Sequence, residues 1–514
     1  MRTSISLYLL TLISFVGQSQ AQWFFIPTFT DIKQAVSEHK TATYTLAGTA
    51  ACSAIATALL KTDYNAVAYG DEPFYWNWNN INTDKITFEN EFLFGAGTSA
   101  YQVEGDCTNT DWHTWETEKN LIPSDKACDQ WNKFKEDIAL LKQMHIGIYR
   151  FSLAWDKIQP TANRFDQDAI EHYKDMCKEL KKHNIKAHIG FHHYADPKWF
   201  ADLGGFETEE NIHYFVDFCA QVIIEFKKDD IDVELWSTFN SPSGYAFHKY
   251  HIGDFPPGIK NNKQLTLTVL KNMMEAHVCM YKTCKAINPN AQIGILKNIM
   301  QLDPWRPWHP LDNFACKIAT DMTDNCIFNF FTTGRFVAKI PFEHAPFMAN
   351  VEHTNMDATG SLDFIGLNYY SHSYIKNMQR LLHPYEIKTK NPNYTLYPEG
   401  LYRAITTITE QMVQPIEQKT NKHLPIYVTE NGVASDNPHH RELFFKRYLY
   451  ALSKAKKEGH DVRGYIFWSF MDNYEWGSYS KKYGLVGVDF DSDDLTRSIK
   501  DDVGTQYFLN IIHA

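Results

Sequence analysis

The segment VTENG at 428–432 closes an apolar run and places the carboxylate of Glu430 where a strand should end. Arg150 and Tyr370 lie in or at the end of other apolar runs, and both side chains can pair with the charge of a carboxylate. A carboxylate that stays ionised can attack an electrophilic carbon. Glu430 is therefore a candidate nucleophile, and the alternative is that it serves only as a salt-bridge partner.

Polar and aromatic residues also mark the ends of most other apolar runs. Glutamine, histidine, asparagine and glutamate offer hydrogen-bond donors and acceptors to hydroxyl groups, and tryptophan offers a flat face to a sugar ring. One such residue at a strand end is usually a satisfied structural group, but seven of the runs share the pattern. We expect the following side chains to converge on one rim and to bind a sugar: Gln102, His193, Asn240, Asn368, Trp468, Glu475 and Trp476.

A regular succession of strands and helices must position these residues. From about residue 89 the chain alternates short apolar runs with longer amphipathic segments, a pattern typical of βα units and a parallel sheet. The eight candidate strands are 92–101, 147–155, 186–194, 233–240, 291–298, 363–370, 425–430 and 462–470. Eight strand–helix repeats predict an α/β fold, a (β/α)8 TIM barrel with loop insertions, the largest of them between Asn298 and Asp363.

The first 21 residues have the form of a secretory signal peptide. Arg2 precedes an apolar stretch from Ile5 to Val16, and Ala21 ends a small-residue cleavage pattern. We therefore expect cleavage after Ala21 and export to the medium, a periplasm or an organelle lumen. No later segment reaches the ~18 apolar residues of a membrane span. The alanine-rich run at 46–60 indicates a buried helix, with membrane association as the alternative.

Between this signal peptide and the barrel region at 89–514 lies an N-terminal extension, residues 22–88. It contains one helical stretch, followed by two tryptophans and several asparagines. The extension could cap the N-terminal face of the barrel or be a removable pro-segment, and its composition favours neither. The sequence gives no prediction of the oligomeric state.

The composition limits the class of partner. A net charge of −11, 44% hydrophobic residues and no lysine or arginine run longer than two describe a folded, mildly acidic protein. We therefore expect no binding to nucleic acid. The nine cysteines and 22 histidines lack zinc spacing, so we expect no metal site and no cofactor. Export would permit a few disulfides, and the pairs to test are Cys107 with Cys128 and Cys316 with Cys326.

The region 89–514 resembles glycoside hydrolase family 1, the retaining β-glucosidases and their relatives. Seven motifs carry this resemblance: FLFGAGTSAYQVEG (92–105), YRFSLAW (149–155), TFNSP (238–242), GDFPPG (253–258), DFIGLNYYS (363–371), VTENG (428–432) and WSFMDNYEW (468–476). The resemblance implies a hydrolase of small-molecule β-glycosides with Glu430 as its nucleophile. It places Arg150, Asn368 and Tyr370 around that nucleophile. The implied sugar contacts are Gln102, His193, Asn240, Trp468, Glu475 and Trp476.

One departure from the family concerns the chemistry directly. A retaining glycosidase uses a second carboxyl group, about 5–5.5 Å from the nucleophile, to protonate the leaving group and then to activate water. The family supplies this group from the glutamate of its T-F-N-E-P pattern, and this chain has Ser241 there. A serine hydroxyl does not titrate in the useful range, and losing acid/base help typically costs ~10² to 10⁴ in rate.

A second departure lies on the third strand. The family pattern H-W-D-L-P-Q appears as HYADPK at 193–198, so the histidine is kept while the tryptophan and the aspartate are not. Asp196 lies one residue further along and could point into the site or away from it. The segment after Glu475 is one residue shorter than usual, which leaves the preferred sugar open.

Three functions stay open. The first is hydrolysis of O- or S-linked β-D-glycosides through a covalent intermediate on Glu430, impaired or specialised for good leaving groups. Plant myrosinases of the family, which have glutamine at this position, are a precedent, and Asp196, His192 or His248 could otherwise supply a proton. The second is an inactive barrel that binds glycosides or another protein, as in Klotho-type relatives. The third is glycosyl transfer to an acceptor other than water. We expect the first.

Overall fold

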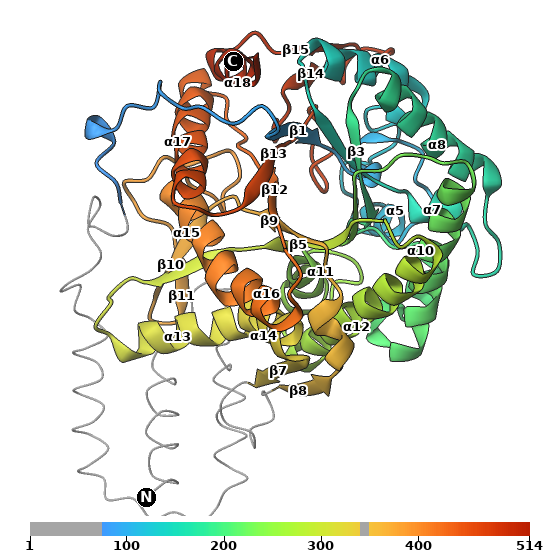
Figure 1. Ribbon diagram of the computed structural model, residues 1–514, viewed down its shortest axis with the longest axis horizontal. Coiled ribbons are helices and arrows are strands. Elements are labelled where there is room, and N and C mark those ends of the chain that lie inside the picture. Colours follow the sequence, from blue (N-terminus) through green and yellow to red (C-terminus); the bar gives the residue numbers. More distant parts are fainter. Residues whose placement is uncertain (1–74, 340–348, 514) are drawn as a thin grey trace, which may run out of the picture.

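The computed structural model describes residues 75–339 and 349–513, which form a closed barrel of parallel strands surrounded by helices (Figure 1). The strands follow one another around the barrel in the order β1-β13-β12-β9-β5-β4-β3-β2. Their bounds are β1 Leu93–Gly97, β2 Ile148–Ser152, β3 Lys186–His192, β4 Leu235–Asn240, β5 Ile293–Asn298, β9 Phe364–Asn368, β12 Ile426–Asn431 and β13 Val462–Trp468. Each matches one of the eight predicted runs, so the predicted (β/α)8 barrel is confirmed.

The strands read as apolar runs because the barrel buries both of their faces. Strands β2, β4, β9 and β12 are buried at every residue. Six side chains from six different strands form a separate apolar cluster, which only the barrel interior can bring together: Ile148, Leu235, Leu296, Phe364, Tyr427 and Ile466. Side chains two residues later on a strand point to the same face. The cluster is therefore the floor beneath Arg150 and Trp468.

Amphipathic helices cover the outside of the barrel. The main ones are α6 Gln130–Gln143, α8 Gln167–Lys182, α10 Ile212–Lys228, α12 Lys263–Ile287, α15 Glu399–Ile408, α17 Pro438–Lys457 and α18 Val503–His513. Helix α8 illustrates how the sequence sets them. The carboxylate of its N-cap Asp166 accepts from the backbone N–H of Ala169, and residues such as Ile170 and Leu180 are buried on its inner face.

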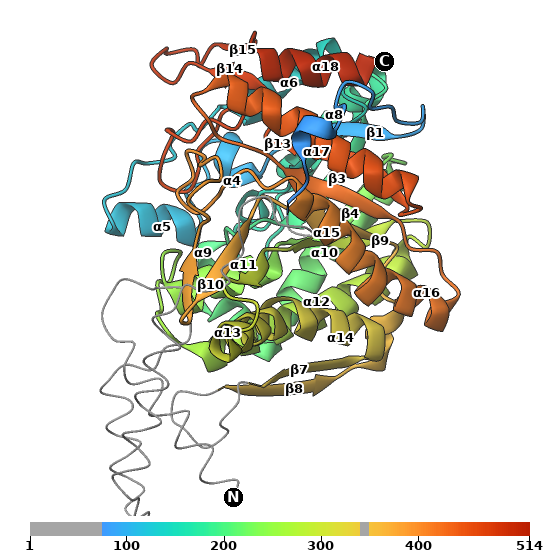
Figure 2. The same cartoon turned by 90° about the vertical axis from the view of Figure 1, so that its left-hand side faces the viewer.

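Two insertions widen the carboxyl end of the barrel. Between β5 and β9 lie β6 Gln301–Pro304, α13 Pro310–Thr320, η5 Asp321–Asn325, α14 Cys326–Thr333, β7 Arg335–Lys339 and β8 Asn350–Thr354. The β7–β8 hairpin lies beside α14, at the end of the molecule away from α18 (Figure 2). After β9, strand β10 His372–Lys376 pairs in parallel with β6 and in antiparallel fashion with β11 Gln379–Leu381. This makes a small sheet outside the barrel.

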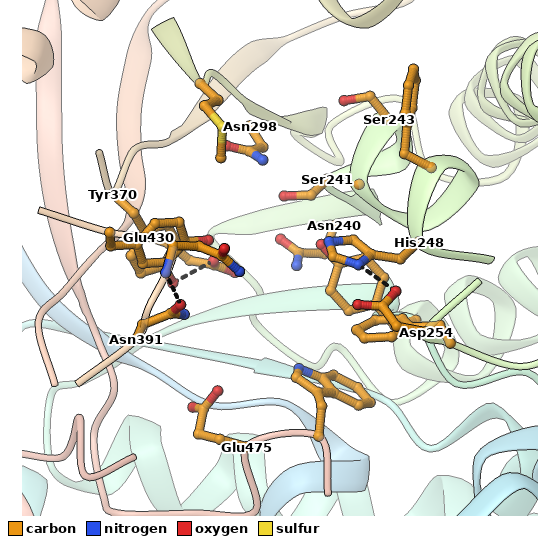
Figure 3. A pocket seen from close by; sticks show the side chains of 18 of the residues that line it. Asn240, Ser241, Ser243, His248, Asp254, Asn298, Tyr370, Asn391, Glu430 and Glu475 are labelled. Carbon is orange, nitrogen blue, oxygen red and sulfur yellow. Dashed lines mark hydrogen bonds and ion pairs between the residues drawn. The ribbon is translucent and has the colours of Figure 1, made fainter. Parts of the chain in front are cut away.

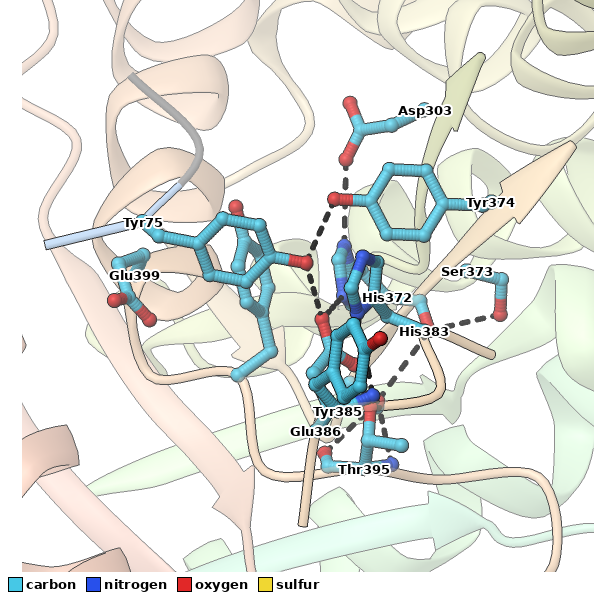
Figure 4. A network of polar contacts seen from close by, with 12 residues as sticks. Tyr75, Asp303, His372, Ser373, Tyr374, His383, Tyr385, Glu386, Thr395 and Glu399 are labelled. Atoms are coloured by element: carbon cyan, nitrogen blue, oxygen red, sulfur yellow. Dashed lines mark hydrogen bonds and ion pairs between the residues drawn. The ribbon is translucent and has the colours of Figure 1, made fainter. Parts of the chain in front are cut away.

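A buried polar network fastens this small sheet to the loop that follows it (Figure 4). The two ring nitrogens of His372 lie 2.7 Å from Glu386 Oε1 and 3.4 Å from Asp303 Oδ2. Glu386 also accepts from the hydroxyls of Tyr75, at 2.7 Å, and Thr395, at 2.6 Å. Burial lowers the pKa of His372, but these carboxylates outweigh burial and raise it overall. The network thus holds residues 383–395 against β6 and β10.

The signal peptide, the run at 46–60 and residues 22–74 of the extension lie outside the described residues. The end of the extension packs against the outer helices. The backbone N–H of Trp76 and the indole of Trp78 both donate to the carboxylate of Glu399, which begins α15. Both indole rings also make edge contacts with Tyr450 of α17. Residues 75–78 therefore lie on the side of the barrel.

The cysteines that the structure describes are all free thiols. Neither Cys107 with Cys128 nor Cys316 with Cys326 forms a disulfide. Burial raises the pKa of each of these four thiols, so they stay protonated inside the core. Within residues 75–339 and 349–513, no helix is long and apolar enough to cross a membrane.

Candidate active site

A cavity of about 820 Å³ opens at the carboxyl ends of the barrel strands. Figure 3 shows Glu430 and Tyr370 on one side of it, with Asn240, Ser241 and His248 on the other. Nine of the eleven predicted site residues line the cavity: Gln102, His193, Asn240, Ser241, Tyr370, Glu430, Trp468, Glu475 and Trp476. The other two, Arg150 and Asn368, lie one layer behind and contact residues of this set.

The carboxylate of Glu430, at the end of β12, is held from two sides. Nη1 of Arg150 lies 2.6 Å from Glu430 Oε1, and the Tyr370 hydroxyl donates to Oε2 at 2.8 Å. Burial and the charge of Glu430 raise the pKa of Tyr370, so its phenol stays protonated and remains a donor. Arg150 also donates to the carbonyl of Thr429 at 3.1 Å and to Asn240 Oδ1 at 2.9 Å. The position of the carboxylate is thus fixed.

Asparagine and histidine side chains connect this carboxylate to the opposite wall. Oδ1 of Asn240 accepts from Arg150 and, at 2.7 Å, from Nδ2 of Asn368. Its Nδ2 therefore donates to His193 Nε2, at 3.1 Å. Burial and then Arg150 lower the pKa of His193, so the ring is neutral and carries its proton on Nδ1. Within the described part of the chain that Nδ1 has no partner, which leaves a buried donor for a ligand hydroxyl.

Ser241 stands at the end of β4, where a wall of the cavity begins. It is 3% exposed, its backbone has a φ of +46°, and its Oγ accepts from Nδ2 of Asn368 at 3.0 Å. Only a minority of non-glycine residues adopt this left-handed conformation. The hydroxyl is thus fixed at the cavity wall.

The three side chains that could supply a proton in place of the missing glutamate lie in different places. The carboxylate of Asp196 pairs with Lys249, at 2.5 Å, and with His192, at 2.8 Å. Neither Asp196 nor His192 lines the cavity, so Asp196 points away from the site. His248 does line it, and its Nδ1 lies 2.9 Å from a carboxylate oxygen of Asp254.

Aromatic rings form the wall near β13 and the segment that follows it. The ring of His193 stacks on Trp468 at 5.5 Å between centroids and on Trp476 at 6.2 Å. The indole N–H of Trp468 donates to Glu475 Oε1 at 3.2 Å. Nε2 of Gln102 donates to the side chain of Asn473 and to a backbone carbonyl, which fixes the amide. Flat apolar faces and fixed polar groups therefore lie together, as sugar binding requires.

The carboxyl group of Glu475 has an unusual acidity. Burial raises its pKa to about 7, against the opposing charge of Lys481 and the hydrogen bond from Trp468. Near neutral pH the group therefore exchanges between an acid and a carboxylate.

The structure also brings in residues that the sequence analysis missed. The loop at 391–394 lines the cavity, and the ring of Tyr394 stacks on Tyr370 at 5.3 Å. The glycosylation sequon NYT at 393–395 overlaps this loop but does not indicate a binding site, and the network around Glu386 sets the position of the loop. Tyr194 and Lys481 line the cavity as well. Tyr194 follows His193 within the HYADPK segment, at the position where the family pattern has a tryptophan.

The chain is similar to known proteins over the whole barrel region. The model of glycosyl hydrolase family 1 matches residues 84–514. A 6-phospho-beta-galactosidase of Staphylococcus aureus (strain JH9) is 27% identical over 461 residues, which cover 79% of this chain and 95% of that protein.

Solved structures of glycosidases have the same fold as this chain. A beta-glycosidase from Pyrococcus horikoshii has a TM-score of 0.71 at 28% identity, covering 83% of this chain and 95% of its own. A GH1 beta-glucosidase from Exiguobacterium antarcticum B7 has a TM-score of 0.72 at 26% identity, and the match covers 83% of this chain and 98% of that one. The family model spans most of the chain, and these structures share its barrel. The chain belongs to glycosyl hydrolase family 1.

Proposed function

We propose that this protein is a retaining β-glycosidase, specialised for O- or S-linked β-D-glycosides whose leaving group needs no proton. One observation carries the proposal. Glu430 is buried in the cavity with Arg150 and Tyr370 on its two oxygens, whereas the end of β4 presents the hydroxyl of Ser241. The arrangement keeps the parts needed for nucleophilic attack and lacks the carboxylic acid that protonates a departing oxygen.

These residues imply the following reaction. The carboxylate of Glu430 forms a bond to the anomeric carbon while the glycosidic bond breaks, and the electron pair leaves with the aglycone. Arg150 and Tyr370 hold the carboxylate in line before the attack. Water then attacks the anomeric carbon and displaces Glu430, and its proton passes to solvent. Without a general base this second step is slow, so the glycosyl-enzyme accumulates when the leaving group is good.

We propose that the sugar is neutral, and Glu475 is the reason. Its carboxylate can accept hydrogen bonds from two hydroxyls but would repel a phosphate. Lys481 lines the same cavity and would attract a phosphate, and eight staphylococcal relatives are named 6-phospho-beta-galactosidase. The choice is testable by comparing 4-nitrophenyl β-D-glucoside with its 6-phosphate. Faster turnover of the phosphorylated substrate would contradict the assignment.

The remaining sugar contacts are assigned by their fixed polar groups and ring faces. Trp468 supports the ring of the sugar, and the unpartnered Nδ1 of His193 donates to one of its hydroxyls. The amides of Gln102 and Asn240 and the indole of Trp476 complete the first subsite. Each of these side chains reaches the cavity.

The test is hydrolysis of 2,4-dinitrophenyl β-D-glucoside, together with the intact mass of the protein during turnover. We expect one hexosyl adduct and release of dinitrophenol, both lost in Glu430→Ala. A methyl β-D-glucoside should be turned over at least ~10²-fold more slowly, because it needs the missing acid. Equal rates on both substrates would refute the proposal. No turnover and no adduct, with glucose still bound in calorimetry, would instead identify a binding protein without catalysis.

A further inference from the structure

The two departures from the family pattern, at Tyr194 and at Ser241, lie on the same wall of the cavity. Tyr194 follows β3 and Ser241 follows β4, 47 positions later in the chain. These strands are neighbours in the barrel, with His192 opposite Phe239 in the register. Tyr194 and Ser241 both line the cavity. One wall of the site therefore carries two hydroxyl groups side by side.

Both side chains approach the same point, beside Gly244. A Cβ placed on Gly244 would lie 2.8 Å from the phenol oxygen and 3.5 Å from Ser241 Cβ. The first distance is a collision, so the phenol occupies space that only a glycine leaves open. Asn368 donates to Ser241 Oγ at 3.0 Å, which leaves the O–H of Ser241 able to donate to another atom.

The ring of Tyr194 is held in this place by its neighbours. Its centroid lies 5.2 Å from His193, 5.6 Å from Phe255 and 5.5 Å from Trp476, each in an edge-on arrangement. The backbone of Tyr194 has a φ of +69°, the second left-handed residue on this wall. Three aromatic contacts and a strained backbone specify one orientation, with the hydroxyl toward Ser241.

The negative charge of Glu430 affects the pKa of the Tyr194 phenol. Burial, and then the negative charge of Glu430, raise the pKa of Tyr194 well above its ordinary value. The phenol therefore stays protonated at every working pH and is a poor source of a transferable proton. Its O–H can still donate a hydrogen bond to an atom that gains negative charge, and such charge-assisted bonds are the strong ones.

We propose that Tyr194 and Ser241 form a hydrogen-bonding pair that binds the leaving-group atom in place of the missing carboxylic acid. This inference rests on the proposed glycosidase function. As Glu430 bonds to the anomeric carbon, the electron pair of the breaking bond moves onto the aglycone oxygen or sulfur. The two hydroxyls donate to that atom without giving up their protons. The aglycone leaves as an anion and takes a proton from solvent.

The pair defines a class of aglycone. A hydrogen bond lowers the energy of an anion but does not neutralise it, so the aglycone must be a stable anion by itself. Phenols with electron-withdrawing substituents, carboxylic acids and acidic thiols satisfy this condition, whereas simple alcohols do not.

The experiment measures kcat/KM for a series of aryl β-D-glucosides from 2,4-dinitrophenyl to phenyl. The proteins are the wild type, Tyr194→Phe, Ser241→Ala and the double variant. We expect a steep dependence on leaving-group acidity in the wild type. In Tyr194→Phe, kcat/KM should fall roughly 10- to 100-fold, with the largest fall for the poorest leaving groups. Because the hydroxyls act as one unit, the double variant should lose less than the product of the single losses.

A matched control is Tyr245→Phe. Tyr245 carries another buried phenol close to this wall, but its O–H donates to Asp196 at 2.6 Å and it does not line the cavity. This variant should leave the leaving-group dependence unchanged even where it lowers the melting temperature. Glucose binding by calorimetry should be retained in Tyr194→Phe, since the phenol faces the aglycone.

Each of the following outcomes would contradict the proposed role of Tyr194 and Ser241. Equal losses on every substrate together with weaker glucose binding would make Tyr194 a structural residue. A wild-type enzyme insensitive to leaving-group acidity would contain a true proton donor elsewhere, with His248 the first to test. A hexosyl adduct with unchanged rates in Tyr194→Phe would refute the pair alone. Absence of both turnover and the adduct in the wild type would refute the glycosidase function as well.

Discussion

Replacing Glu475 by glutamine should separate folding stability from sugar binding. Burial raises the pKa of this carboxyl group to about 7 from an ordinary value near 4.5. That difference corresponds to about 3 kcal/mol of stability that depends on pH. Because the folded state binds the proton more tightly, this stability is fully present below pH 4.5 and is lost as the pH rises through 7. Glutamine is neutral throughout and can keep the contact to Trp468.

The assay is urea denaturation of the wild type and Glu475→Gln between pH 4.5 and 8.5. We expect the variant to gain stability relative to the wild type as the pH rises, by about 3 kcal/mol above pH 7. Glu118→Gln, a change at an exposed site of α5 (Asp111–Glu118), is the control and should show no such trend. Glucose should bind more weakly to Glu475→Gln at pH 8, because a carboxylate acceptor is lost. A stability difference that stays constant with pH would refute the reasoning.

Other substitutions test the rest of the site and its support. Glu430→Ala should lower turnover of 2,4-dinitrophenyl glucoside by ~10⁴-fold or more, and azide should then yield the α-glucosyl azide, detectable by NMR. Arg150→Met leaves the Glu430 carboxylate buried without its cation and should cost ~3–5 kcal/mol in urea denaturation. Ser241→Glu should restore turnover of methyl glucoside more fully when Tyr194→Phe removes the neighbouring phenol oxygen. His372→Gln should destabilise the fold most below pH 6.5, because the stability from a raised histidine pKa is lost as pH rises through that pKa.

The barrel could be predicted because each of its strands is buried on both faces and therefore appears as an apolar run. The bounds were too long where a strand passes into a polar turn. The first run was predicted over 92–101, but β1 ends at Gly97 and helix α4 (Ala100–Val103) begins soon after it. The small β6–β10–β11 sheet could not be predicted. Its pairing depends on contacts such as His372 with Glu386 and Asp303, which join distant segments.

The strand-end residues of the site could be predicted for a topological reason. In a (β/α)8 barrel all strand carboxyl ends meet at one rim, so Asn240 and Glu430 had to approach each other. The direction of Asp196 could not be predicted, because Lys249, 53 positions later, draws it away from the cavity. The position of the loop at 391–394 could not be predicted for the same reason, because partners elsewhere in the chain set it.

The energetics of the site argue that it is kept for chemistry. A buried ion pair such as Arg150 with Glu430 stabilises a fold little more than apolar residues of the same volume would. The burial of Glu475 destabilises the protein above pH 7. Folding alone requires neither of these features. Glucose binding would account for Glu475, but it would not require a fixed carboxylate facing a pair of hydroxyls. That combination is what cleavage of a glycoside with a stable leaving anion would use.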